Sequence, residues 1–258
     1  YRVADMTLEP IASAKAILSE EEKEAGIALV DIGGGTTDIT IFHEGIIRHT
    51  AVIPFGGNVI TKDIKEGCRV MQQQAEKLKL KFGSALAEEV YDNRIITIPG
   101  LRGHEPKEIS EKNLARIIQA RVEEIFDYVV WEIRRSGYGR KLIGGIILTG
   151  GGALLNHIDK LVAYHTGMNT RIGHPVENLA NGYGKEMSSP IYATGIGLVI
   201  KGIEDVEEGR IQYESLLNEQ ESQKEEAETM IDDNREKWYE QLFRRTKEWF
   251  EAEPDSEF

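Results

Sequence analysis

Two glycine clusters in this chain follow apolar segments and could gather backbone N–H groups around an anion. The first lies in "IALVDIGGGTTDITIF", residues 27–42, and the second ends "KLIGGIILTGGG", residues 141–152. Glycine accepts positive φ and lets another group approach the backbone closely. Successive N–H groups in such a turn form a concavity that holds an anion. The two clusters therefore predict a site for a ligand that carries phosphate.

The first cluster adds hydroxyl groups at Thr36 and Thr37 and carboxylates at Asp31 and Asp38. Carboxylates repel a bare phosphate, but they suit a hydrated Mg²⁺ or a water molecule oriented for attack on a phosphoryl group. A phosphate-binding P-loop is excluded because no Gly-Lys-Ser/Thr sequence occurs, and a dinucleotide fingerprint would need a glycine where Asp38 stands. A glycine-rich hairpin without a ligand is the alternative.

The residues around the clusters predict a mixed α/β layer interrupted by a mainly helical insertion over 54–140, with a short β region near Arg94–Pro99. Strands joined by tight turns, such as the one at Gly45, are antiparallel. The remaining expected elements are helices over 8–18, 154–165 and 191–200, strands over 27–31, 38–42, 46–53 and 170–172, and a buried strand within 141–152.

Composition limits the classes of protein. The 258 residues suffice for one large or two small domains, and the single cysteine, Cys68, excludes a disulfide framework and suits a reducing cytoplasm. No apolar run is long enough to span a membrane, and no signal-peptide pattern opens the chain. The chain starts at Tyr1 without a methionine, so we expect it to be part of a longer protein.

The net charge of −13 belongs mostly to one segment. Residues 1–202 are nearly neutral, whereas residues 203–236 carry 13 acidic and 3 basic side chains. This composition favours a polar, acidic linker, and a solvated helix is the alternative. Nucleic acid is not an expected partner, because the chain offers no strong basic stripe.

The last segment, 237–252, predicts an amphipathic helix with bulky apolar residues on one stripe and basic neighbours. This pattern favours an interfacial membrane anchor, and a helix docked on protein is the alternative. The residues expected to enter the membrane surface are Trp238, Leu242, Phe243, Trp249 and Phe250.

Four motifs carry a resemblance to the actin-like ATPase superfamily, which includes actin, sugar kinases and heat-shock chaperone ATPases. "DIGGGTTD" resembles its second phosphate-binding hairpin, and "IILTGGGALL" resembles its adenosine motif. "LEPIASAKAIL" and "SSPIYATGIGLVI" resemble its two connecting helices. The superfamily's first phosphate hairpin, Asp-x-Gly-Thr/Ser, is missing near the N-terminus. The chain thus resembles the second half of an actin-like (ribonuclease H-like) protein. The resemblance implies domain IIA over 1–53 and 141–202 and an inserted α+β domain IIB over 54–140.

The resemblance also implies ATP and Mg²⁺ as cofactors and a role for each matching residue. Asp31 would orient water, or Mg²⁺ through water, with no residue bound directly to the metal. Glu76 and Lys79, three residues apart on one helix face, would reach the ribose and adenine, although a solvated ion pair is the alternative. The glycines and threonines expected at phosphate and adenosine are Gly33, Gly34, Gly35, Thr36, Thr37, Gly150, Gly151 and Gly152.

"GIIRHTAVIPFGGNVITKDI", "AEKLKLKFGSAL" and "TRIGHPVENL" together most resemble the C-terminal portion of the FtsA family of bacterial cell-division proteins. That family implies a polymerising adaptor, at most a weak ATPase, which tethers FtsZ to the cytoplasmic face of the inner membrane at the division septum. An MreB-like filament protein and a sugar kinase-like phosphotransferase are the alternatives. The C-terminal peptide of FtsZ is expected on domain IIB, at the basic residues Lys107, Lys112, Arg116 and Arg121.

Overall fold

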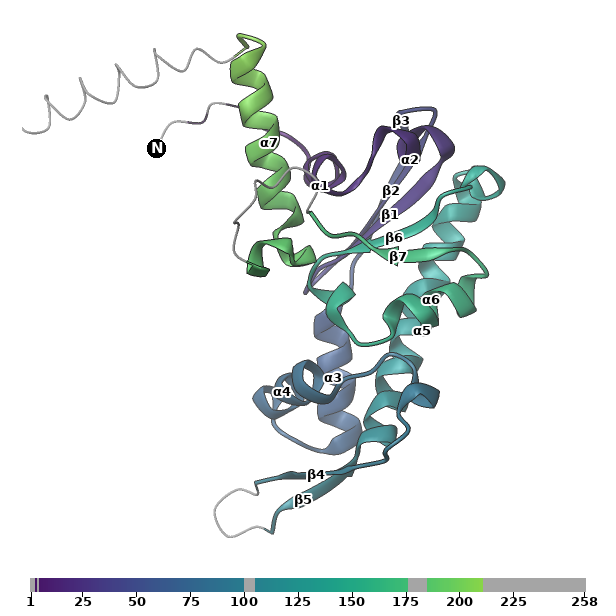
Figure 1. Cartoon of the computed structure of the whole chain (residues 1–258). Coiled ribbons are helices and arrows are strands. Elements are labelled where there is room, and N and C mark those ends of the chain that lie inside the picture. The colour runs from purple at the N-terminus through teal and green to yellow at the C-terminus, as the bar shows by residue number, and fades with distance from the viewer. Residues whose placement is uncertain (1–2, 4, 100–104, 176–184, 211–258) are drawn as a thin grey trace, which may run out of the picture. The chain divides into compact units, whose positions relative to one another are not determined.

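The computed structural model describes residue 3 and residues 5–99, 105–175 and 185–210 (Figure 1). The chain separates into two compact units, Tyr1–Gly202 and Ile203–Phe258. The predicted membrane residues and most of the predicted linker lie outside the described residues. Among the described residues, no helix is long and apolar enough to cross a membrane.

The first unit is built on a five-stranded mixed sheet in the order β3-β2-β1-β6-β7. β1, β2 and β3 are antiparallel neighbours, whereas β6 and β7 run parallel to β1. The bounds are β1 Ile27–Ile32, β2 Thr37–His43, β3 Ile46–Ile53, β6 Gly145–Thr149 and β7 Thr170–Ile172. The strands expected from the sequence are therefore present, each within one residue of its predicted range apart from the broadly placed β6.

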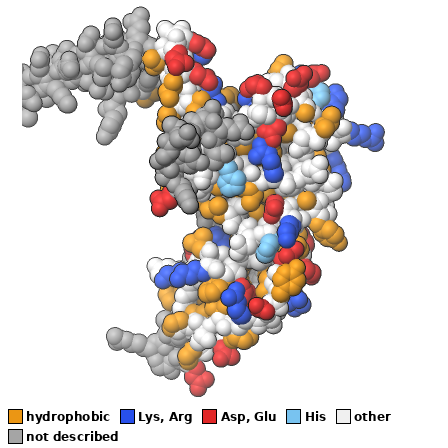
Figure 2. All heavy atoms as spheres, viewed as in Figure 1, with side chains coloured by type: hydrophobic (Ala, Val, Ile, Leu, Met, Phe, Trp, Pro, Cys, Tyr) orange, Lys and Arg blue, Asp and Glu red, His pale blue; other side chains and the backbone are white. Residues whose placement is uncertain are grey.

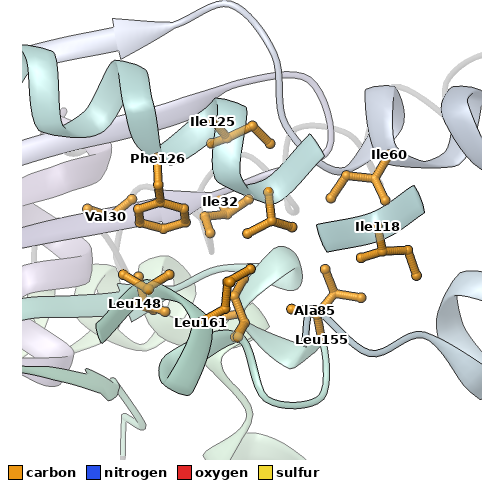
Figure 3. Packing of buried hydrophobic residues seen from close by; sticks show 14 of the residues in the cluster. Val30, Ile32, Ile60, Ala85, Ile118, Ile125, Phe126, Leu148, Leu155 and Leu161 are labelled. Atoms are coloured by element: carbon orange, nitrogen blue, oxygen red, sulfur yellow. The ribbon is translucent and has the colours of Figure 1, made fainter. Parts of the chain in front are cut away.

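Helices cover both faces of this sheet because side chains alternate along β1. Ile27 and Leu29 pack with helices α1 and α7 on one face, and Val30 and Ile32 pack with α5 and α6 on the other. Figure 3 shows this second face, with Phe126 of α5 beside Val30. The bounds are α1 Glu9–Ile17, α2 Glu20–Ala25, α5 Glu111–Arg135, α6 Ile158–Thr166 and α7 Ala193–Glu207.

The insertion consists of helices packed above a small antiparallel hairpin. Its first part contains α3 Gly57–Cys68, α4 Gln72–Phe82, the short 3₁₀ helix η1 Ala87–Glu89 and the hairpin strands β4 Ile95–Ile98 and β5 Lys107–Ser110. Helix α5 follows β5 directly and runs back to the sheet (Figure 1). At 1.5 Å per residue its 25 residues span about 37 Å. One long helix therefore joins the insertion to the sheet.

Several local expectations differ from the structure. Helix α2 was not expected, although Ser19 and Glu22 form a capping box that starts it. Helix α6 begins at Ile158 rather than 154, because the second glycine cluster leads into the 3₁₀ helix η3, Gly151–Leu154. Strand β5 was also missed. The remaining short 3₁₀ helices are η2 Gly139–Lys141, η4 Lys185–Ser188 and η5 Pro190–Tyr192.

The predicted boundary at residue 203 falls inside a helix, since α7 continues to Glu207. The first five residues of the segment predicted as a linker are therefore helical. In the second unit, the Arg210 guanidinium lies 3.1 Å from Asp205.

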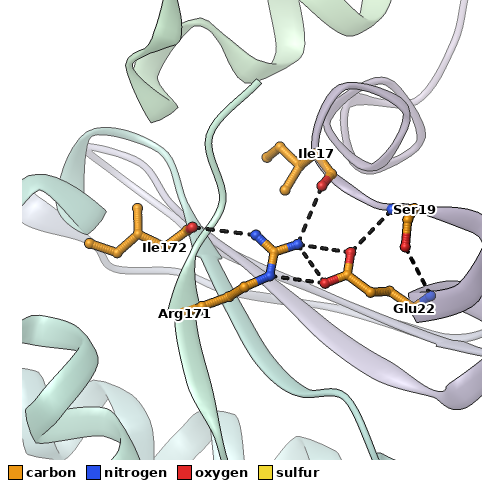
Figure 4. Close-up of polar contacts among 5 residues, drawn as sticks. All are labelled: Ile17, Ser19, Glu22, Arg171 and Ile172. Atoms are coloured by element: carbon orange, nitrogen blue, oxygen red, sulfur yellow. Dashed lines mark hydrogen bonds and ion pairs between the residues drawn. The ribbon is translucent and has the colours of Figure 1, made fainter. Parts of the chain in front are cut away.

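Arg171 on the edge strand β7 joins the sheet to the turn between α1 and α2 (Figure 4). Its guanidinium donates to the Glu22 carboxylate at 2.6–2.9 Å and to the Ile17 carbonyl at 3.4 Å. Paired hydrogen bonds between arginine and a carboxylate fix orientation as well as distance. This contact holds the end of α1 against the sheet.

Figure 2 shows one face of the molecule, on which acidic and basic side chains are interspersed.

Candidate functional site

A cleft of about 320 Å³ lies where the two glycine loops face the insertion. One wall comes from the loop after β1, one from α3 and α4, and one from the loop after β6. These segments are far apart in the sequence and meet because β1 and β6 are parallel neighbours whose carboxyl ends lie together. The lining residues are Gly33, Gly34, Gly57, Asn58, Ile60, Glu76, Lys79, Leu80, Gly83, Gly151, Gly152, Leu154, Leu155, Asn156 and Ile191.

The first glycine loop is held in place by the start of α3. Gly57 N–H donates to the Gly33 carbonyl at 2.9 Å, and Asn58 N–H donates to the Gly34 carbonyl at 2.8 Å. A Cβ atom at Gly56 would lie 2.4 Å from the Gly33 carbonyl oxygen, so only glycine allows this approach. The loop carbonyls are thereby bound within the protein.

The glycines of the two clusters serve two different needs. A Cβ atom at Gly150 would lie 2.2 Å from Asp31 Oδ1, and one at Gly152 would lie 2.3 Å from Ile32 Cγ2. These two glycines are required by packing against β1. A Cβ atom at Gly151 would meet nothing within 4 Å, and one at Gly34 would meet only the Asn58 side chain at 3.5 Å. Gly34 and Gly151 therefore leave space in the cleft that the fold itself does not need.

Glu76 and Lys79 form the expected pair on α4, with Lys79 Nζ 2.9 Å from Glu76 Oε2. Lys79 Nζ also donates to the Gly57 carbonyl at 3.1 Å and lies 2.8 Å from Thr61 Oγ1. Burial acts to raise the pKa of Glu76, but the hydrogen bonds from Thr61 and Lys79 and the lysine charge outweigh it and lower the pKa. Lys79 is therefore mostly buried between α3 and α4, whereas the Glu76 side chain is 41% exposed.

Asp31 lies at the end of β1, directly opposite Asp38 in the antiparallel register. Burial raises the pKa of Asp31 to about 6, and the charges of Glu9 and Asp38 add to the rise, while a hydrogen bond from Ser13 opposes it. The structure thus places a poorly solvated carboxylate beside the second glycine cluster. Sequence reasoning did not identify Glu9 as part of this acidic group, although it lies in the motif "LEPIA".

Six of the predicted ligand-binding residues line the cleft: Gly33, Gly34, Glu76, Lys79, Gly151 and Gly152. Asp31, Gly35, Thr36, Thr37 and Gly150 are not among the lining residues. The Thr37 hydroxyl is buried and donates to the Phe55 carbonyl at 2.9 Å, so it joins β2 to the segment before α3. Thr36 donates to Asp38 at 3.0 Å.

Asn58 and Asn156 line the cleft but were not predicted from the sequence. The amide of Asn156 donates to the Gly83 carbonyl at 2.9 Å and joins the second glycine loop to the insertion. Asn58 lies within the segment "GIIRHTAVIPFGGNVITKDI" and Asn156 directly follows "IILTGGGALL", but neither residue was singled out there. Among the described histidine, cysteine, aspartate and glutamate residues, no group of three is arranged to hold a metal ion.

A family model described as "Cell division protein FtsA" matches residues 28–197, which include both glycine clusters and the whole insertion. FtsA of Pseudomonas aeruginosa is 42% identical over 207 residues, covering 80% of this chain and 49% of the relative. The chain belongs to the FtsA family. FtsA of Bacillus subtilis is 38% identical over 76% of the chain and 43% of the relative, and FtsA of Escherichia coli is 33% identical over 84% and 53%.

Solved structures confirm the actin-like α/β fold of this FtsA-family chain. MreB5 of Spiroplasma citri bound to ADP aligns with a TM-score of 0.63 and 26% identity over 78% of this chain and 61% of that one. Its AMPPNP-bound form gives 0.64 and 25% over 79% and 61%. The chain spans about half the length of the curated FtsA relatives it matches.

The basic residues predicted to meet a partner lie on β5 and α5 of this FtsA-family chain. They differ in whether their charges are already paired inside the fold. Arg121 Nη2 lies 3.0 Å from Asp63 Oδ1, and its guanidinium also contacts Glu124. The charge of Arg121 is therefore already paired with carboxylates within the fold. Among the described residues, Arg116 donates only to the neutral Asn113 side chain, at 3.3 Å. Lys107 donates to a backbone carbonyl, and Lys112 is half-buried.

Proposed function

We propose that the complete protein is an ATP-binding, polymerising adaptor that tethers FtsZ to the cytoplasmic face of the inner membrane at the division septum. The observation that carries the nucleotide part is the cleft, where Gly34, Gly151 and the Glu76–Lys79 pair meet from three separate segments. The likeness to MreB5 structures that hold ADP and AMPPNP supports the same ligand class. Membership of a cell-division family supports the site of action.

In this proposal, each side of the cleft contacts a different part of ATP. The backbone around Gly33 and Gly34 meets the β- and γ-phosphates, and Gly151 leaves room for the adenosine. Glu76 and Lys79 lie on the sugar side, where Lys79 also fixes the distance between α4 and the first turn of α3. When bound, Mg²⁺ would neutralise phosphate charge.

Asp31 would act on a water molecule rather than on phosphate. Its raised pKa suits a carboxylate that accepts a proton near neutral pH, which is the property required of a general base. Because this chain corresponds to about half of its relatives, a complete phosphate site requires residues from the remainder of the protein. We therefore propose at most a weak ATPase.

The adaptor part of the proposal uses two further surfaces. Lys107, Lys112 and Arg116 would meet the acidic C-terminal peptide of FtsZ, since complementary charges favour association and orientation. The amphipathic segment 237–252 would bind the membrane surface. Weak anchoring by one such helix becomes stronger when a polymer aligns many copies, through avidity.

The nucleotide proposal is tested by Gly34→Val in the full-length protein. Modest crowding at Asn58 should leave the fold intact, while the branched side chain occupies the space at the first glycine loop. We expect Mg-ATP binding, measured by calorimetry, to be lost. Gly139→Val is the matched control, because a Cβ atom there meets only Ile133, at 3.4 Å. Unchanged ATP affinity in a folded Gly34→Val protein would contradict the assignment.

A further inference from the structure

One buried hydroxyl group joins the two helices that form a wall of the cleft. Thr61 lies in the second turn of α3, is 1% exposed, and is not among the described residues that line the cleft. Its Oγ1 atom contacts polar groups of three residues that do line it: the Gly57 carbonyl at 3.1 Å, Glu76 Oε2 at 2.5 Å and Lys79 Nζ at 2.8 Å. Thr61 would therefore affect a ligand in the cleft through these groups and not by direct contact.

The ordinary role of such a hydroxyl group is a hydrogen bond within its own helix. A helical threonine often donates to the carbonyl four residues earlier, which here belongs to Gly57. A hydroxyl group has a single proton, however, so it donates to one acceptor at a time. The contact with Glu76 is the shorter of the two, and hydrogen bonds to a carboxylate are the stronger kind. Thr61 therefore donates to Glu76 and accepts a hydrogen bond from Lys79.

The Glu76 carboxylate is held at one oxygen and open at the other. Oε2 accepts from Thr61 and lies 2.9 Å from Lys79 Nζ. Among the described residues, no hydrogen bond involves Oε1, and the side chain is 41% exposed in the cleft. Burial acts to raise the pKa of Glu76, but the hydrogen bonds from Thr61 and Lys79 lower it. The free oxygen therefore belongs to an ionised carboxylate, which can only accept hydrogen bonds.

Lys79 depends on the same hydroxyl group. Its ammonium has three donors, and three acceptors lie around it: the Gly57 carbonyl at 3.1 Å, Thr61 Oγ1 and Glu76 Oε2. The lysine side chain is only 11% exposed, so a donor left without an acceptor would destabilise this arrangement. Removal of the Thr61 hydroxyl takes an acceptor from Lys79 and a donor from Glu76 at once. Both side chains would then shift from their present positions.

We propose that Thr61 is a positioning residue for ribose recognition: it holds Glu76 so that the free carboxylate oxygen accepts a hydrogen bond from a ribose hydroxyl group. The inference deepens the proposed nucleotide binding and rests on it. An ionised carboxylate attracts a hydroxyl donor and repels a phosphate, so the sugar is the part of the nucleotide that it suits. A site built to bond a hydroxyl group rejects the analogue that lacks it. The cleft should therefore prefer ribonucleotides, and this preference should depend on Thr61.

The test measures sugar discrimination by calorimetry on the full-length protein, with the magnesium complexes of ATP, 2′-deoxy-ATP and 3′-deoxy-ATP. At least one deoxy analogue should bind the unchanged protein about tenfold more weakly than ATP, since a hydrogen bond to a charged group is lost. Thr61→Val keeps the shape but removes the hydroxyl group, so the affinity ratio should fall below about threefold, through weaker ATP binding. Thr61→Ser retains the hydroxyl group and should restore the ratio.

Thr40→Val is the matched control. Thr40 is also 1% exposed, lies on β2, and has no hydrogen-bond partner for its hydroxyl group among the described residues. This substitution should leave the ratio unchanged. Thr61→Ala is a second variant that leaves space for a water molecule beside Lys79, in case valine prevents folding, and it should lower the ratio in the same way.

A double variant separates positioning from a general effect on the fold. If Thr61 acts through Glu76, Thr61→Val/Glu76→Ala should bind ATP as Glu76→Ala does, within about twofold, because coupled residues are not additive. Additive losses of ATP affinity would overturn the inference. So would equal losses for ATP and both deoxy analogues in Thr61→Val, or an unchanged ratio in a folded Thr61→Val or Thr61→Ala protein.

Failure of the inference differs visibly from failure of the proposed function. Equal affinity of the unchanged protein for ATP and both deoxy analogues would overturn ribose recognition by Glu76 and Thr61 while leaving nucleotide binding intact. No binding of any of the three nucleotides to the unchanged, folded protein would contradict the proposed nucleotide site itself, and the inference with it.

Discussion

Asp31→Asn tests whether burial and the neighbouring negative charges destabilise the ionised Asp31 carboxylate at the end of β1. Antiparallel pairing places it opposite Asp38, and burial with the charges of Glu9 and Asp38 raises the pKa of Asp31 from 3.8 to about 6. The folded state therefore binds a proton more tightly than the unfolded state does. The resulting contribution to stability is fully present below the unfolded pKa and is lost as pH rises through about 6.

The magnitude follows from this shift. At 1.36 kcal/mol per pKa unit, an ionised Asp31 costs the fold about 3 kcal/mol at pH 8 and about half as much at pH 5, where the folded protein is mostly protonated. Asparagine has nearly the same shape, cannot ionise and can still accept the hydrogen bond from Ser13. Asp31→Asn should therefore stabilise the chain at pH 8 and give a smaller gain at pH 5.

The assay is urea unfolding followed by circular dichroism at both pH values, without nucleotide. The free energies of unfolding are compared provided that the two proteins have the same m-value, the slope of the unfolding free energy against urea concentration. Glu88→Gln is the control, because Glu88 is exposed on η1 outside the cleft and should change stability by less than about 0.5 kcal/mol. A neutral or destabilising Asp31→Asn at pH 8, or a gain that does not fall by pH 5, would refute the reasoning.

Three further predictions concern the glycines, the partner surface and the tail. Gly150→Ala should lower the free energy of unfolding by about 2 kcal/mol or more, because φ is +80° and the new Cβ atom would overlap the Asp31 carboxylate. Gly151→Ala should change the free energy of unfolding little, because the new Cβ atom meets nothing within 4 Å. Urea unfolding of both variants measures the difference. Lys112→Glu/Arg116→Glu should weaken binding of the FtsZ C-terminal peptide about tenfold or more in a fluorescence anisotropy assay with unchanged melting temperature, and equal affinity would move the site elsewhere. Ending the chain at Glu236 should abolish sedimentation with anionic vesicles, and retained binding would show that residues 237–252 are not an anchor.

Much of the fold was predictable because its signals are local. The β-branched runs around residues 27–53 and the tight turn at Gly45 give the antiparallel strands directly. The proline in the first turn of α1 marks the start of a helix. Helix α2 and strand β5 were missed because they are short and mostly polar, so they lack the apolar periodicity on which the prediction depends.

The cleft was predictable only in part. Glu76 and Lys79 are spaced for one helix face, but their half-buried position depends on α3, which supplies Thr61 and the Gly57 carbonyl. Arg121 was expected to meet a partner, and only the packing of α3 against α5 shows that Asp63 already neutralises it. Such contacts join residues more than a dozen positions apart, and no local pattern records them.

The sequence by itself determined the family resemblance, the mixed sheet and the presence of glycine where backbone approaches backbone. A missing Cβ atom is a local property, so it can be read from the residue type. Only the tertiary structure decided which glycines serve the fold and which leave room in the cleft. Gly150 and Gly151 are identical neighbours in sequence, yet one packs against Asp31 and the other faces open space. The difference arises because the side-by-side pairing of β1 and β6, not the residue itself, determines what each position meets.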